Sequence, residues 1–504
     1  MRPALLLAAA LAIPILPAAL VAQVTADSSM TVAKAAAAAA AANTISINFV
    51  WTLVAGFLVM LMQAGFAMVE AGFTRAKNAG HTMTMNLMVY GIAMMAYWAV
   101  GFAIQGGGVS ALGGLGTWDA AHLFTVKLGS HEWGLFGTKG FFLAGVAYSA
   151  PVFAYFLFQM VFMDTTATIP TGALAERWKF LSFVVFSLFI GGLIYPIYAN
   201  WVWGGGWLSQ LGVNLGLGHG HADFAGSSVV HLTGGVIALV TARLLGPRRG
   251  KYNKDGSANA IPGHNIPMAL VGTFILCFGW FGFNAGSTLA GSDLRIGIIA
   301  TNTMLAGAAG SMTAMIYMYL KYGKPDPSML ANGALAGLVA ITAPCAFVTA
   351  PVAVLIGGIA GVLVIWAVFF FERTMRIDDP VGAISVHGVN GLWGILALGL
   401  FADGTYGEGW NGVPGKVTGL FYGDSGQFLA QVIGGVTNIL VVGSLAGLCW
   451  FITGLITKGH RVSAEVEELG LDLPEMGSLA YPDAGELSSA VVLTGGSSTS
   501  RKAA

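Results

Sequence analysis

The feature that most constrains this chain is a series of continuous apolar stretches, each of roughly 20 residues, that recurs along most of its length. A helix of that length crosses about 30 Å of hydrocarbon, the thickness of a bilayer core. Only 9% of the residues are charged, against about 25% in an ordinary soluble domain, so the chain cannot cover a water-exposed surface. The stretches do not alternate as the strands of a membrane barrel do. The sequence therefore predicts an all-α integral membrane protein.

Eleven transmembrane helices are expected. The predicted spans are Ile45 to Gly72, Met83 to Ile104, Val146 to Pro170, Leu181 to Asn200, Phe224 to Leu245, Met268 to Gly286, Ile296 to Leu320, Met329 to Ala346, Val352 to Phe371, Val381 to Phe401 and Phe428 to Ile456. Glycines at small-residue spacings within the spans predict close helix packing. Examples are Gly234, Gly235, Gly357, Gly358 and Gly361.

The distribution of Lys and Arg predicts the orientation, because these residues concentrate in cytoplasmic loops. With the N-terminus outside, the inside segments contain Arg75, Lys77, Arg177, Lys179, Arg243, Arg248, Arg249, Lys251, Lys254, Lys321, Lys324, Arg373, Arg376, Lys458 and Arg461. The outside segments contain only Lys34, Lys127, Lys139, Arg295 and Lys416. The sequence therefore predicts an outer N-terminus and a cytoplasmic C-terminus.

The two ends of the chain differ in composition from the spans. Residues 1–26 have the pattern of a secretory signal peptide, with Arg2, an apolar stretch and a small-residue cleavage site. An Ala-rich periplasmic lead-in is expected over 27–44, the transmembrane domain over 45–457 and a cytoplasmic tail over 458–504. The Gly/Ser-rich composition after about residue 482 predicts disorder.

A faint internal repeat relates the two halves of the spanning region. Thr171-Gly-Ala-Leu-Ala returns as Asn332-Gly-Ala-Leu-Ala, an offset of 161 residues (332 − 171), and Val-His231 returns as Val-His387, an offset of 156 (387 − 231). Each half would hold five spans, so the second half enters from the opposite side. The pattern predicts an inverted 5+5 repeat plus an eleventh helix.

Net charge and cysteine usage argue against several classes of protein. The net charge is zero, which gives no reason to expect a nucleic-acid partner. Cys277, Cys345 and Cys449 lie in apolar segments and are expected to pack as small hydrophobic residues. His219 and His221 lie in a Gly-rich outer loop, where we expect them to be solvated rather than to bind metal. Without a nucleophile triad, metal cluster or phosphate loop, an enzyme is not expected, nor is a cofactor.

His231 and His387 are the main candidates for function. Ionisable side chains inside a membrane are costly and typically face a pathway. Each histidine alone could be a satisfied core residue, but the two occupy matching positions of the repeat and are expected to meet near the middle. A facing imidazole pair can share one proton and leave its other nitrogens for a substrate.

Aromatic residues gather around the histidine segments. Phe158 and Phe162 lie one helical turn apart, Trp203 begins Trp-Gly-Gly-Gly, and Trp280 and Phe283 lie within Gly-Trp-Phe-Gly-Phe-Asn-Ala-Gly-Ser287. Aromatic faces attract small cations. The alternative is packing at the membrane interface.

Asp223 precedes the span that carries His231 and is expected to cap its N-terminus. A direct role in ion binding is the alternative for this carboxylate.

These segments together resemble the Amt/Mep/Rh ammonium transporter family, and its bacterial Amt-type branch most closely. The matching motifs are Phe158-Gln-Met-Val-Phe162, Gly172-Ala-Leu-Ala-Glu-Arg177, Trp203-Gly-Gly-Gly206, Asp223 to His231, Gly279 to Ser287, and Asp378-Asp-Pro380 leading to Val386-His-Gly388. The resemblance runs from about residue 45 to 481.

The resemblance implies a role for each motif residue. Phe158, Trp203 and Ser287 would recruit ammonium at the outer side, and Phe162 and Phe283 would form a gate below them. His231, His387 and Trp280 would line the pore, with Asp223 as structural support. The family also implies a homotrimer with one pore per subunit in the bacterial cytoplasmic (inner) membrane, with ammonium or ammonia as the substrate.

Two positions depart from the family pattern. Asp164 follows the gate residue Phe162 where a neutral side chain is expected, so it either modulates proton movement or bonds Thr165, Thr168 or nearby backbone. Met476 stands in the tail where many members have histidine, so regulation by a PII-type protein is implied only weakly. Two rival functions stay open, a Rhesus-type channel for neutral ammonia or carbon dioxide and an ammonium sensor that transports little.

Overall fold

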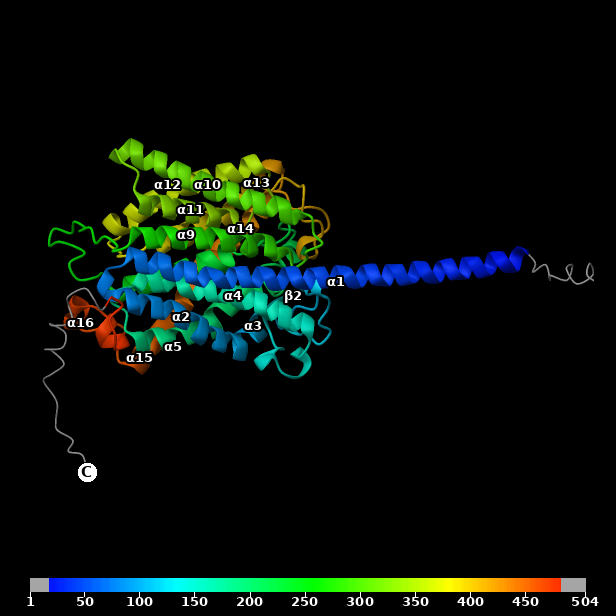
Figure 1. The fold of residues 1–504 in the computed structure, drawn as a ribbon, viewed down its shortest axis with the longest axis horizontal. Coiled ribbons are helices and arrows are strands. Elements are labelled where there is room, and N and C mark those ends of the chain that lie inside the picture. The colour runs from blue at the N-terminus through cyan, green and yellow to red at the C-terminus, as the bar shows by residue number, and fades with distance from the viewer. Residues whose placement is uncertain (1–17, 482–504) are drawn as a thin grey trace, which may run out of the picture.

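Long apolar helices make up most of the chain in the computed structural model, which describes residues 18–481 (Figure 1). The main helices lie side by side along one direction, and the first part of α1 projects beyond the others. The helices are α1 (Ala18–Phe73), α2 (Ala79–Ala96), α3 (Phe102–Gly106), α4 (Ala150–Leu174), α5 (Phe180–Phe189), α6 (Tyr195–Trp203), α7 (Leu211–Leu215), α8 (Thr233–Leu245), α9 (Ile266–Trp280), α10 (Arg295–Tyr322), α11 (Pro327–Ile341), α12 (Ala350–Phe369), α13 (Asn390–Phe401), α14 (Ser425–Thr437), α15 (Gly443–Thr457) and α16 (Ala464–Leu469).

Nine helical stretches of the described chain are long and apolar enough to cross a membrane. They overlap nine of the eleven predicted spans. The other two predicted spans coincide with α10, which has 28 residues but a less apolar composition, and with the apolar 15-residue helix α11. The prediction of a helical membrane protein is therefore confirmed, while the count of eleven spans stays a prediction.

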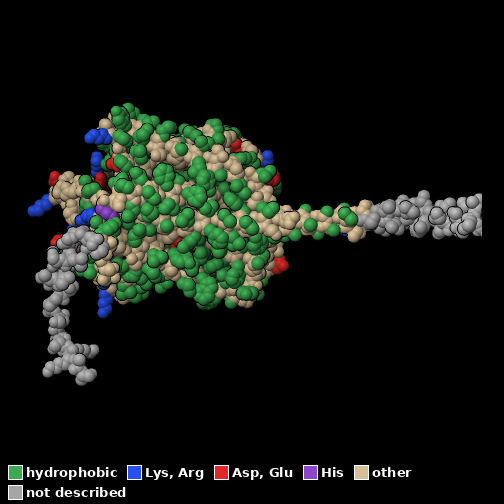
Figure 2. All heavy atoms as spheres, viewed as in Figure 1, with side chains coloured by type: hydrophobic (Ala, Val, Ile, Leu, Met, Phe, Trp, Pro, Cys, Tyr) green, Lys and Arg blue, Asp and Glu red, His purple; other side chains and the backbone are tan. Residues whose placement is uncertain are grey.

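The surface of the bundle is apolar around its middle (Figure 2). Exposed large hydrophobic side chains of the bundle helices include Phe274, Trp366 and Phe451. Most Lys and Arg side chains visible in this view gather at the end away from the projecting part of α1. This distribution is typical of a bundle surrounded by lipid.

Glycines bring the helices into close contact, as the sequence predicts. A Cβ atom on Gly235 of α8 would collide with the backbone of Gly388, and one on Gly357 of α12 would collide with the backbone of Ala306. Gly358 is less constrained, because its nearest neighbour would be the Thr313 methyl group at 3.4 Å. Side chains at the tight positions would push the helices apart.

A β-hairpin between α3 and α4 has no counterpart in the sequence predictions. Strands β1 (Leu123–Leu128) and β2 (His131–Gly137) pair antiparallel. The indole Nε1 of Trp201 donates to the Leu135 carbonyl at 2.9 Å and ties the hairpin to α6. Because this contact comes from a distant part of the chain, the local sequence pattern does not indicate it.

The C-terminal segment that follows α15 packs against the bundle before the described chain ends. Arg461 bonds Glu467 at 2.7 Å, and the Asp472 carboxylate accepts the backbone N–H groups of Gly80 and His81 at the start of α2. The disorder expected after about residue 482 lies outside the described residues. The same holds for residues 1–17 of the expected signal peptide, and from Ala18 onward the chain is helical through the expected cleavage point.

Candidate functional site

His231 and His387 lie in contact at the centre of the bundle. Their Nδ1 atoms are 3.2 Å apart and their ring planes are inclined by 26°. Both rings are buried, and His231 Nε2 has no hydrogen-bond partner in the described chain. One ring must donate and the other accept in such a contact, so the pair shares one proton.

Each histidine occupies a π-helical turn at the start of its helix. His231 lies in the turn Ser227–Leu232 before α8, and His387 lies in the turn Ile384–Val389 before α13. Such turns are rare and often occur at functional sites. The wider winding displaces the side chain relative to a regular helix, which no periodicity in the sequence reveals.

Asp223 caps the first of these turns, as predicted. Its carboxylate accepts the backbone N–H groups of Gly226, Ser227, Ser228 and Val229 at 2.7 to 3.0 Å. These donors are the orphan amides of a helix start, which an acidic side chain satisfies well.

Asp379 has the same role at the second turn and was missed by the sequence analysis. It accepts the N–H groups of Gly382, Ala383 and Ile384 at 2.7 to 3.1 Å. Its distance from His387 along the chain equals that of Asp223 from His231, eight residues in both halves (387 − 379 and 231 − 223). The repeat offset of the histidines could have revealed it.

A column of aromatic rings covers the histidine pair on one side. The ring centroids of Phe158 and Phe162 are 4.7 Å apart and those of Phe162 and Phe283 are 4.2 Å apart, with the ring planes tilted by 41° and 34°. Phe283 and Trp280 in turn lie 5.4 and 5.3 Å from His231. Phe162 and Phe283 are fully buried and separate the histidines from the rings above them.

Trp203 and Ser287 lie at the outer end of this column and are partly exposed. The Trp203 ring meets Phe162 edge-on at 6.0 Å, and its Nε1 donates to the Asp223 carbonyl at 2.7 Å. The Ser287 hydroxyl donates to the Phe283 carbonyl at 2.8 Å. Since that bond uses its only proton, the Ser287 oxygen is left to accept from a donor.

Asp164 is buried in α4 without the partners that the sequence analysis offered as its structural alternative. Its Oδ1 atom has no hydrogen-bond partner in the described chain. The hydroxyl of Thr165 donates to the Val161 carbonyl, and that of Thr168 accepts from Gln63 at 2.6 Å. Within residues 18–481, no hydrogen bond joins Asp164 to Thr165 or Thr168, the two hydroxyl groups named in the structural alternative.

The prediction that His219 and His221 are solvated is wrong. Both rings are buried, because α14 packs against their loop through Gln427, whose side chain accepts from the His219 amide. His221 Nε2 lies 2.9 Å from the Ser228 hydroxyl, which donates to Asp223. Burial lowers the pKa of His221 to about 4, so this ring is neutral and supports the capping carboxylate.

Glu70 and Phe66 of α1 also lie near the histidine pair, and the sequence analysis missed them. Phe66 lies 5.9 Å from His387 between ring centroids. Glu70 is buried and lines a small cavity together with His387. The rule that singled out the histidines applies equally to an acid inside the first predicted span, so Glu70 could have been found.

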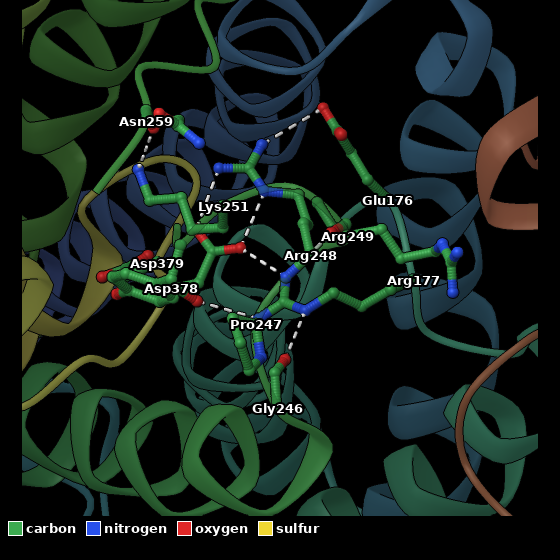
Figure 3. A network of polar contacts seen from close by, with 12 residues as sticks. Glu176, Arg177, Gly246, Pro247, Arg248, Arg249, Lys251, Asn259, Asp378 and Asp379 are labelled. Carbon is green, nitrogen blue, oxygen red and sulfur yellow. Dashed lines mark hydrogen bonds and ion pairs between the residues drawn. The ribbon is translucent and has the colours of Figure 1, made fainter. Parts of the chain in front are cut away.

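Buried ion pairs fix the loops at the Arg-rich end of the bundle (Figure 3). Arg248 binds both oxygens of Asp378 at 2.9 Å and lies 3.4 Å from Glu176. Arg177 donates to the Asp378 and Gly246 carbonyls. Burial alone would raise the pKa of Asp378, but the charges of Arg248 and Arg177 overcome it and hold that pKa well below its usual range.

The fold and the buried site define a multi-pass helical membrane protein with a histidine pair and a column of aromatic rings in its core. Residues 50–481 match the family model described as the Ammonium Transporter Family. The chain belongs to this family, which includes the Amt and Mep proteins.

Relatives of known name span nearly the whole chain. It is 49% identical over 442 residues to the ammonium transporter Amt2 of Archaeoglobus fulgidus, covering 87% of this chain and 89% of the relative. It is 34% identical over 436 residues to the ammonium transporter of Bacillus subtilis, and the match covers 86% of this chain and 98% of the relative.

Solved structures of the same fold include one named Sensor Amt Protein, with a TM-score of 0.74 and 37% identity, covering 86% of this chain and 98% of that one. Mep2 of Saccharomyces cerevisiae gives a TM-score of 0.71 and 27% identity, and the match covers 87% of this chain and 92% of that one.

Proposed function

We propose that this protein carries ammonium across the membrane by separating it into ammonia and a proton inside the bundle. Ammonium is recruited at the outer rings, passes the phenylalanine gate, loses its proton and continues as ammonia along the histidine pair. The proposal rests above all on one observation, the 3.2 Å contact between His231 and His387 beneath the closely packed rings of Phe162 and Phe283.

Recruitment takes place at Phe158, Trp203 and Ser287. Aromatic faces attract a small cation with about 0.5 to 2 kcal/mol, depending on how far water is removed. The Ser287 oxygen replaces one hydrogen bond that ammonium makes to water. Trp203 is held in place because its Nε1 donates to the Asp223 carbonyl.

Selectivity follows from chemistry rather than size. Potassium resembles ammonium in size and charge, but it has no proton to lose. A bare cation in the buried apolar passage pays a large desolvation cost, whereas neutral ammonia pays little. Asp223 orients the turn that carries His231, and Trp280 forms the pore wall with its Nε1 bonded to Thr342 at 3.0 Å.

The pathway lies between two inverted halves of five spans, followed by an eleventh span. The matched caps Asp223 and Asp379, and the matched π-helical turns of the two histidines, support this arrangement. The N-terminus lies outside and the C-terminus in the cytoplasm of a bacterial cell with this transporter in its inner membrane. The gathering of Lys and Arg at one end supports the orientation (Figure 2).

Three such subunits assemble, each with its own pore. The apolar face of α10 and α12 contains a shallow groove of about 730 Å³ lined by residues such as Tyr317 and Trp366, which gives a surface for subunit contact. Native mass spectrometry of the purified protein tests the trimer.

A PII-type protein at the cytoplasmic face is a candidate partner, and co-purification of the two proteins tests this.

A sensor that transports little is the second candidate, because the chain is 37% identical to the structure named Sensor Amt Protein. A Rhesus-type neutral gas channel is the third candidate.

The test of the proposed function uses proteoliposomes and a microbe that lacks ammonium transport. Uptake of ammonium without uptake of potassium, and growth rescue on low ammonium, are expected. Growth failure with little uptake would instead favour the sensor, and uptake without current the gas channel.

A further inference from the structure

Glu70 of α1 is a buried carboxyl group that the pathway described above does not use. Its Oε2 atom accepts from Asn86 Nδ2 at 2.7 Å and lies 2.8 Å from the Thr171 hydroxyl. Within residues 18–481, no Lys or Arg forms an ion pair with it. A buried acid without a counter-charge is costly in a membrane and is typically retained for function.

A cavity joins Glu70 to the histidine pair. It measures about 20 Å³ and is lined by Glu70 and His387 with apolar neighbours such as Phe66 and Val386. One water molecule needs roughly 10 to 15 Å³ of such space and at least two polar partners. The cavity therefore has room for a single water, and its lining includes His387 and Glu70 as polar partners for that water.

The surroundings of Glu70 suit both its charged and its neutral form. The Thr171 hydroxyl lies 2.5 Å from the Thr168 carbonyl as well as 2.8 Å from Glu70. It has one proton, so it donates either to an ionised Glu70 or to the carbonyl while accepting from a protonated Glu70. Rotation of the Thr171 hydroxyl therefore keeps Glu70 hydrogen-bonded in both its ionised and its protonated form.

Beyond Glu70 the path opens toward the Arg-rich end. A vestibule of about 410 Å³ shares Asn332 and Val381 with the small cavity, and the side chain of Asn332 donates to the Val381 carbonyl between them at 3.2 Å. The vestibule also contains Asp379, whose carboxylate is engaged as the helix cap. Glu70 is therefore the acid that stands between the histidines and the vestibule.

We propose that Glu70 is the inner proton-exchange group of the transporter. The proton released by ammonium reaches His387, passes through the cavity water to the Glu70 carboxylate, and leaves a neutral imidazole. Protonated Glu70 then gives this proton to ammonia in the small cavity, before the ammonia reaches the vestibule, which restores the carboxylate and forms ammonium. The inference rests on the proposed function, and it adds that the proton travels with the ammonia.

The experiment compares charge moved with ammonium moved in proteoliposomes that contain the full-length protein. Glu70→Gln keeps the shape and hydrogen bonding of the side chain but cannot exchange a proton. Glu132→Gln is the matched control, because Glu132 is an exposed acid of β2 that lines neither the small cavity nor the vestibule. Infrared difference spectra recorded on adding ammonium report protonation of a carboxyl group.

Wild type and the control are expected to move charge with ammonium and to show the carboxyl signal. Glu70→Gln is expected to reduce the charge moved by about 100-fold, the lower end of what a positioned acid or base contributes, and to lose the signal while ammonia still crosses. If Glu70→Gln does not fold, Glu70→Asp carries the test, since its carboxyl group is withdrawn from the cavity and should slow charge movement.

Unchanged charge per ammonium in Glu70→Gln, or in Glu70→Asp when that variant carries the test, would overturn the inference. Wild-type uptake without any charge would overturn it as well and would favour the neutral gas channel. Absence of ammonium uptake by the wild type would instead contradict the proposed function itself, so the two failures can be told apart.

Discussion

At the scale of single residues, the buried acids of this protein differ in what satisfies them. Asp223 and Asp379 accept backbone amides, and Asp378 pairs with Arg248. Glu70 has only neutral donors, and Asp164 Oδ1 has no partner in the described chain. The first group holds helices and loops in position, while the second group faces the interior uncompensated.

Replacing Asp223 should unfold the protein more easily and weaken transport. Asp223→Ala leaves several buried amides without acceptors, which costs about 2 kcal/mol or more. We expect a lower unfolding temperature in detergent and reduced ammonium uptake, with Asp223→Asn intermediate because one oxygen acceptor is kept. Equal unfolding temperatures for all three proteins would contradict the capping role.

Replacing Asp378 should destabilise the protein in a pH-dependent way. Its pKa is lower in the folded state than the ordinary value of about 3.9, so the ionised carboxylate contributes stability above that pH and the contribution is lost as the pH falls below it. Asp378→Asn should cost about 3 to 5 kcal/mol near pH 7, because the buried Arg248 loses the carboxylate that binds it at 2.9 Å and keeps only the more distant Glu176 at 3.4 Å.

The measurement for Asp378 is thermal unfolding of wild type and variant between pH 3 and pH 7. The difference between their unfolding temperatures should be constant from pH 7 to 5 and narrow toward pH 3. A difference that grows on acidification would have the wrong sign and would exclude the buried ion pair as its source.

At the scale of elements, the sequence predicts helices well and their irregularities poorly. Apolar stretches of sufficient length identify the spans, because hydrophobicity alone decides what can cross lipid. The π-helical turns around His231 and His387 depend on packing between helices and have no local signal. The burial of His219 and His221 depends on α14, which is about 200 residues further along the chain.

The sequence also predicts part of the functional site, namely the aromatic rings and the histidine pair. Motif resemblance brought together the rings and the histidines, and the repeat placed the histidines opposite each other. Glu70 was overlooked although an acid within a span is itself a signal. The absence of the expected partners of Asp164 could not be foreseen, since hydrogen bonding within a bundle depends on side-chain geometry.

The variant Gly235→Ala tests the close contact between α8 and the turn that carries His387. A methyl group there would collide with the backbone of Gly388, next to His387, so Gly235→Ala should separate α8 from the second histidine turn. We expect strongly reduced ammonium uptake and a lower unfolding temperature. Gly297→Ala is the matched control in α10, because nothing lies within 4 Å of its added methyl group; equal behaviour of the two variants would show that this contact does not matter.

At the scale of the whole molecule, a lipid-facing apolar surface encloses a narrow interior in which charge is scarce (Figure 2). Charged residues gather at the ends, where ion pairs such as Arg248 with Asp378 fix the loops (Figure 3). The interior can therefore bind and release a proton at few places. This scarcity gives a physical basis for conducting ammonia while rejecting ions that have no proton to lose.

The most direct test of this account is ammonium uptake by the double variant His231→Ala, His387→Ala in proteoliposomes, with potassium as the competing ion. The matched control is His122→Ala, His131→Ala, which removes two histidines of the outer loop and hairpin. We predict that the pore variant assembles normally but loses selective ammonium uptake, while the control keeps it. Undiminished uptake with unchanged discrimination against potassium in the pore variant would contradict the account.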